Sequence, residues 1–69
     1  MTLDDYRVKL GWSKARLARE AKVDQRTIGE AIAGKRIYKA TAGKIANAVS
    51  KAVGYEVTYK EIEGLNLAD

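Results

Sequence analysis

Residues 14–34 decide the fold, and they read KARLAREAKVDQRTIGEAIAG. Leucine and alanine recur at helical spacing over residues 14–21, which predicts a helix with one apolar side. Asp24 is a good N-cap for the next helix along the chain, over residues 24–33, and Gly34 can close that helix in the left-handed conformation. Because so few residues separate the two helices, we expect them to cross steeply.

The helix predicted over residues 24–33, the third of the chain, has two unlike sides. Ile28, Ala31 and Ile32 form an apolar stripe that we expect to face the core. The residues on the other side are small, polar or charged, and they are Gln25, Arg26, Gly29, Glu30 and Ala33. We therefore expect that side to face away from the core.

The rest of the chain predicts further short helices, four or five in all, in one compact all-α domain over residues 1–69. Their bounds are set by capping residues and glycines: Thr2 and Gly11 for the first helix, Thr41 and Gly54 for the fourth, Thr58 and Gly64 for the last. Thr58 and Glu61 have the spacing of a capping box. We expect a basic loop over residues 35–40 and a frayed tail over residues 65–69.

Length and composition exclude several classes of protein. The 69 residues contain no Cys and no His, which removes disulfides, thiolate nucleophiles, imidazole bases and the usual zinc ligands. The carboxylates are scattered and no Gly-rich phosphate loop follows a strand, so we expect no enzyme, cofactor, metal ion or small-molecule ligand. No apolar run is long enough to span a membrane and the N-terminus does not look like a signal peptide, so we expect a cytoplasmic protein.

The net charge of +4 is unevenly distributed. Residues 14–40 carry eight cations against three carboxylates, a net charge of +5, whereas residues 1–13 are neutral and residues 41–69 carry −1. A basic middle third is expected of a chain that faces a polyanion. Charge alone is equally consistent with an ordinary solvated surface.

Six short motifs follow one another along the chain: Leu3-x-x-Tyr6-Arg7, Gly11-Trp12-Ser13, Leu17-Ala18-Arg19-Glu20-Ala21, Val23-Asp24-x-x-Thr27-Ile28, Gly34-Lys35 and Lys44-Ile45-Ala46-x-Ala48-Val49. With these motifs the stretch from Leu3 to Ile62 resembles the helix-turn-helix family of the phage lambda repressor and Cro. The resemblance explains why Ala18 is small, since the two motif helices touch there, and why an apolar Val23 fills the turn.

The sequence departs from the family pattern in three places. Lys22 stands where the turn usually has glycine, so it must tolerate an unusual backbone at a cost of about 1 kcal/mol. Lys14 stands where the second helix of the family, here residues 14–21, commonly begins with Gln. The lysine preserves a phosphate contact but weakens any inferred amide bridge to the third helix. The fourth helix is extended by residues 50–53, either for packing or for a dimer contact.

The resemblance implies that four residues of the third helix read bases in the major groove. Gln25 suits adenine, Arg26 suits guanine and the carboxylate of Glu30 suits cytosine, while Gly29 lets the helix approach closely. The resemblance also implies a thymine-methyl contact from Thr27 or Ala33. The alternative is that Arg26 and Glu30, four residues apart, simply pair on an exposed helix face.

The resemblance also implies a set of phosphate-binding residues, which are Lys14, Arg16, Thr27, Lys35, Arg36, Tyr38 and Lys39. For any one of them the alternative is a solvated charged surface. Trp12, the only tryptophan, is better explained as a core residue than as a stacking platform, and Tyr6 is also expected to pack in the core.

These observations favour a DNA-binding regulator of transcription, similar to a repressor or Cro, of phage or mobile-element origin. Its partner would be a double-stranded DNA operator, bound by a homodimer because one reading helix covers only a few base pairs. The alternative function is a protein-binding module, such as an antitoxin or an adaptor, on the same fold. That function predicts an apolar or acidic outer side of the third helix, whereas the side found here is polar and lies in the basic third.

Overall fold

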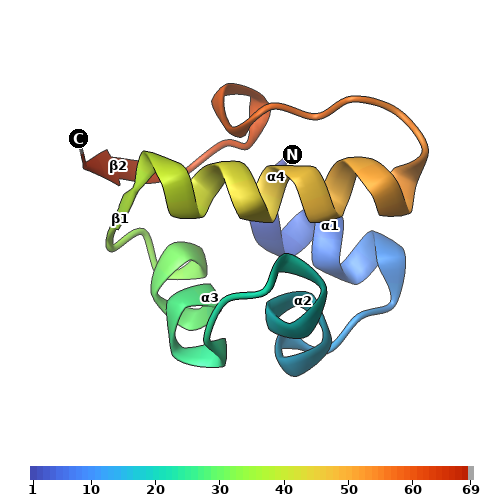
Figure 1. Ribbon diagram of the computed structural model, residues 1–69, viewed down its shortest axis with the longest axis horizontal. Helices are drawn as coiled ribbons and strands as arrows, with labels where there is room; N and C mark the ends of the chain where they lie inside the picture. The colour runs from blue at the N-terminus through green and yellow to red at the C-terminus, as the bar shows by residue number, and fades with distance from the viewer. Residues whose placement is uncertain (69) are drawn as a thin grey trace.

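Four α-helices make up most of the computed structural model, which describes residues 1–68 (Figure 1). They are α1 (Leu3–Leu10), α2 (Lys14–Ala21), α3 (Gln25–Ile32) and α4 (Lys39–Val53). The remaining elements are β1 (Arg36–Tyr38), the 3-10 turn η1 (Tyr59–Glu61) and β2 (Asn66–Ala68). Figure 1 shows α4, the longest helix, lying across the other three. Within residues 1–68, no helix is both long and apolar enough to cross a membrane.

Helix α1 begins and ends where its sequence predicts. The Asp5 N–H donates to the Thr2 hydroxyl at 3.1 Å, and the Thr2 N–H donates to the Asp5 carboxylate at 2.9 Å, which completes a capping box. The backbone hydrogen bond from Thr2 lowers the pKa of the Asp5 carboxyl. Gly11 closes the helix with a φ of 70°.

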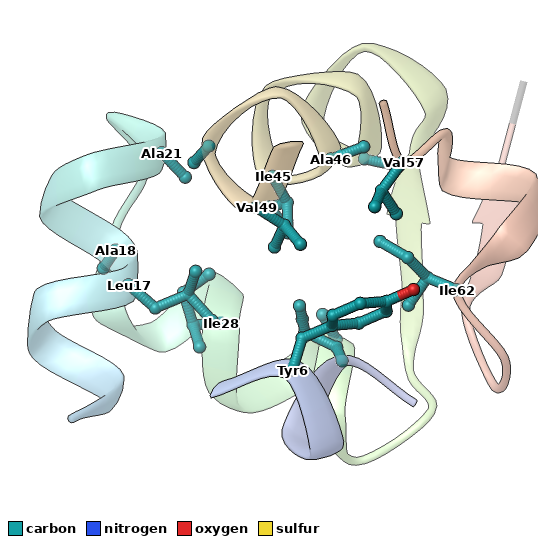
Figure 2. Close-up of a cluster of buried hydrophobic side chains, with 14 of the residues drawn as sticks. Tyr6, Leu17, Ala18, Ala21, Ile28, Ile45, Ala46, Val49, Val57 and Ile62 are labelled. Atoms are coloured by element: carbon teal, nitrogen blue, oxygen red, sulfur yellow. The ribbon is translucent and has the colours of Figure 1, made fainter. Parts of the chain in front are cut away.

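The core lies where α4 packs on α1, α2 and α3. Leu17, Ile28, Ile45 and Val49 are completely buried. Figure 2 shows Ile45 and Val49 pointing from α4 into the same interior as Ile28 and Tyr6. The predicted stripes of α2 and α3 therefore both face this core, and Tyr6 and Trp12 are buried in it as expected.

A short parallel sheet makes the domain mostly helical rather than all-α. β1 pairs with β2 in the register Arg36↔Asn66, Ile37↔Leu67 and Tyr38↔Ala68. The prediction of a basic loop over residues 35–40 is therefore wrong, because residues 36–38 form a strand and α4 begins at Lys39. The expected fraying of residues 65–69 is also wrong for residues 66–68, while Asp69 lies outside the described residues.

Two of the predicted helix bounds also need correction. Helix α4 begins at Lys39 with Tyr38 as its N-cap, three residues before the start predicted from a Thr41 cap, so Thr41 lies inside the first turn. The predicted last helix is reduced to the turn η1. There the Thr58 hydroxyl donates to the Glu61 carboxylate at 3.3 Å, and the Thr58 side chain accepts from no backbone N–H of the described residues.

The extension of α4 over residues 50–53 serves packing. The Ser50 hydroxyl oxygen accepts from the Val57 N–H at 2.8 Å and lies 2.8 Å from the carbonyl oxygen of Ala46. Val57 is buried against the core. Through its hydrogen bonds to the Val57 backbone, Ser50 thus holds the segment that follows Gly54 against the C-terminal part of α4.

Candidate nucleic-acid interface

The turn between α2 and α3 keeps the geometry of the motif without its usual glycine. Lys22 adopts the left-handed conformation, with φ of 60° and ψ of 42°, and it is the only non-glycine residue with positive φ among the described residues. The Val23 N–H then donates to the Ala18 carbonyl oxygen at 3.0 Å. Ala18 is 4% exposed and Val23 packs against the core, so the small residue at the crossing and the apolar residue in the turn have the roles predicted for them.

The start of α2 presents two of the predicted phosphate-binding cations. The Ser13 hydroxyl caps the helix by accepting from the Arg16 N–H at 3.0 Å, and no carboxylate lies in the first turn of α2. The Arg16 guanidinium lies 5.1 Å from the centre of the Trp12 ring, a cation–π contact. Lys14 and Arg16 are both exposed, and Arg16 packs on the ring of the buried Trp12.

The outer side of α3 carries the four predicted base-reading residues. Gln25 and Arg26 are exposed, and Gly29 and Glu30 are half-buried. The Arg26 Nε atom lies 3.8 Å from a Glu30 carboxylate oxygen, so the pairing expected as the alternative does form. The side chain of Arg26 is nevertheless 88% exposed, and such an exposed pair stabilises the helix by at most about 1 kcal/mol. A base edge that accepts two hydrogen bonds can displace it.

Packing among the described residues does not require glycine at position 29. Glycine in a helix interior costs roughly 0.5–1 kcal/mol relative to alanine. A Cβ built at Gly29 would meet no heavy atom of the described residues within 4 Å, so an alanine side chain would fit. The absence of a side chain there leaves the surface of α3 smooth for close approach by something outside the domain.

The N-terminus of α3 differs from the prediction in one detail. Asp24 occupies the N-cap position, with φ of −68° and ψ of 147°. Its carboxylate, however, accepts no hydrogen bond from the first turn in the described part of the chain. The Thr27 side chain lies in this first turn and is half-buried.

The remaining phosphate candidates follow α3 directly. Arg36 and Tyr38 lie on the exposed side of β1, with Tyr38 67% exposed, whereas Ile37 between them is buried. Lys35 and Lys39 flank the strand and are exposed. Over residues 1–68 no carboxylate pairs with Lys14, Lys35 or Arg36. The charge of these three cations is therefore not neutralised by any carboxylate of residues 1–68.

Asn66 also touches this region, and it is not among the residues predicted from the sequence. The Asn66 side-chain amide donates to the Gly34 carbonyl oxygen at 3.4 Å, so β2 reaches the turn that ends α3. The available signal was the alternation of Leu65 and Leu67, a period of two that is typical of a short strand. Both leucines pack against the core.

A family model described as helix-turn-helix matches residues 3–59. The chain belongs to the helix-turn-helix family of the lambda repressor and Cro type. No curated protein and no solved structure matches the chain significantly. The family is one of DNA-binding regulators of transcription, and the matched range includes all four helices and β1. Strand β2 lies beyond it.

Proposed function

We propose that this protein regulates transcription by binding a short operator in duplex DNA, with α3 in the major groove. One observation carries the proposal: α3 presents a polar outer side that includes an unobstructed glycine, between two groups of exposed cations along the chain. Lys14 and Arg16 precede it, and the segment from Lys35 to Lys39 follows it. Cations at both ends hold a helix on the phosphate backbone while its side chains reach bases.

In this pose the two sets of residues have different tasks. Gln25, Arg26 and Glu30 form hydrogen bonds to base edges, and Gly29 allows the close approach. The cations and hydroxyl groups bind phosphate, and they are Lys14, Arg16, Thr27, Lys35, Arg36, Tyr38 and Lys39. A role in binding another protein through α3 would instead call for an apolar or acidic outer side.

Selection from a random library of duplex DNA tests this function most directly. We expect the selected sequences to share a short motif, and log affinity for it to fall linearly with log salt concentration, because bound phosphates release counterions. A selection that enriches no motif, together with affinity that does not change with salt, would contradict the proposal.

We also propose that the protein acts as a homodimer, at least on DNA. Helix α3 has only eight residues, and a helix of that length contacts few base pairs. Specific binding then needs two half-sites about 34 Å apart. Titrations should show cooperative binding of two chains to inverted half-sites at this spacing. Equal affinity for one half-site and for two would mean that the chain acts alone.

A further inference from the structure

The C-terminal segment, residues 62–68, joins three parts of the domain that are far apart in sequence. Ile62 is buried in the core. Next to it, the Glu63 N–H donates to the Met1 carbonyl oxygen at 3.0 Å, and Glu63 forms a parallel bridge with Thr2. Strand β2 then pairs with β1, as Figure 1 shows beside the start of α4. The segment therefore connects the start of α1 with the strand that follows α3.

The pairing determines which side chains of β1 face outward. Ile37 is 6% exposed and lies opposite Leu67, which packs against the same core. Arg36 and Tyr38, on either side of Ile37, are consequently both exposed. A slip of one residue would bury these two and expose Ile37, because side chains alternate along a strand.

The turn before β1 is held by the same strand. Gly34, which follows the end of α3, has a φ of 79°, and its carbonyl oxygen accepts the hydrogen bond from the Asn66 side chain. Asn66 thus holds the beginning of the stretch from Gly34 to Tyr38 through its hydrogen bond to Gly34, and β2 holds the rest by pairing with residues 36–38. In this structure, without DNA, the backbone of residues 34–38 is therefore held by contacts with β2.

We propose that β2 is a positioning element for DNA binding, and that Asn66 and the pairing with β1 hold Arg36 and Tyr38 ready to contact phosphates. This inference rests on the proposed function, since it assigns a role at the same interface. Without β2, the backbone of β1 would have to be ordered on binding, and ordering one residue lowers affinity by about tenfold. Preorganisation removes that loss.

Two variants test the role of β2. Asn66→Ala removes the hydrogen bond to Gly34 and should weaken duplex binding about threefold. Leu67→Pro removes an N–H in the middle of β2 and should weaken binding about tenfold, because proline is excluded from paired strand interiors. The control is Asn47→Ala, the same substitution at an exposed position of α4, which should bind like the wild type. Circular dichroism gives the folded fraction of each variant at the temperature of the titration.

A double-variant cycle separates positioning from general destabilisation. If β2 acts through Arg36 and Tyr38, then Asn66→Ala should lose most of its effect in a chain that already carries Arg36→Ala and Tyr38→Phe. A variant that merely unfolds part of the sample would weaken both backgrounds by the same factor. Additive effects would therefore overturn the proposal, and Asn66→Ala keeps the test valid if Leu67→Pro does not fold.

The two proposals fail in different ways. A wild-type chain that binds no duplex DNA would remove the proposed function and, with it, the role of β2. A wild-type chain that binds a selected operator, together with Asn66→Ala and Leu67→Pro variants of unchanged affinity, would remove only the role of β2.

Discussion

The pair α2–α3 and the sheet β1–β2 are both needed to build one interface, but they are held together in different ways. The helices are fixed by completely buried side chains, above all Leu17 and Ile28, and by the close contact at Ala18. The sheet has three residue pairs, one amide hydrogen bond, the buried Ile37 of β1 and the half-buried Leu67 of β2. The helical part of the interface thus depends on several completely buried side chains, whereas the strand part has fewer core contacts and depends more on local pairing, so we expect it to loosen more easily.

The largest expected effect follows from this difference in burial. Leu17→Ala should lower the free energy of unfolding by about 2–5 kcal/mol, because it removes a completely buried side chain and leaves a cavity. Leu67→Ala, at a half-buried position of β2, should cost clearly less, about 1 kcal/mol. Denaturant titrations of both variants measure the difference. Equal losses would mean that β2 belongs to the same cooperative core as α2 and α3.

The same difference decides what the sequence can predict. An apolar stripe such as Ile28, Ala31 and Ile32 has the i, i+3, i+4 spacing of a helix, so it identifies both the helix and its buried side. Caps and glycines, such as Thr2 and Gly11, add the bounds of α1. The family resemblance, and with it the helix-turn-helix, could therefore be recognised from residues alone and is confirmed by the family model.

The strands could not be predicted with the same certainty. Three residues such as Arg36, Ile37 and Tyr38 show at most one alternation, and their pairing depends on Asn66 and Leu67 thirty residues later. The predicted start of α4 was wrong for a related reason. Thr41 is a good N-cap by residue type, but β1 ends at Tyr38 and the helix begins at the next residue, Lys39. The roles of the individual site residues remain predictions, since they concern contacts with DNA.

The next effect compares the two parts of the interface on DNA. Arg26→Ala, on α3, should cost about 1–3 kcal/mol on the selected site and relax the choice of base at one position. Lys35→Ala, next to β1, should weaken all sequences nearly equally and lower the salt slope by about one unit. Titrations on the selected site, its single-base variants and unrelated DNA distinguish these outcomes. If Lys35→Ala changed base preference while Arg26→Ala did not, the docking pose would be wrong.

A smaller effect concerns the turn inside the helical part. Lys22→Gly should raise the free energy of unfolding by up to about 1 kcal/mol, because glycine adopts positive φ without the strain of a Cβ. Lys51→Gly, at an exposed position inside α4, should have the opposite sign and cost about 1 kcal/mol. Thermal melts of the two variants give the comparison. A loss of stability in Lys22→Gly would show that the lysine side chain stabilises the turn by more than its backbone costs.

The smallest effect on stability belongs to Gly29, and it separates folding from binding. Gly29→Ala should stabilise the domain by roughly 0.5–1 kcal/mol, since alanine favours the helix and its Cβ would meet nothing within 4 Å among the described residues. The same variant should bind the selected operator more weakly, because the added methyl group lies between α3 and the base edges.

Gly43→Ala is the matched control for this last prediction, because Gly43 is also a half-buried glycine of a helix whose Cβ would meet nothing within 4 Å of residues 1–68. It lies on α4, outside the proposed interface, so it should raise stability to a similar extent and leave DNA affinity unchanged. A gain in stability at both positions with a loss of affinity only at Gly29 would place the close approach to DNA on α3. If Gly29→Ala bound the operator as tightly as Gly43→Ala does, the outer side of α3 would not approach bases closely, and the docking pose proposed here would have to be abandoned.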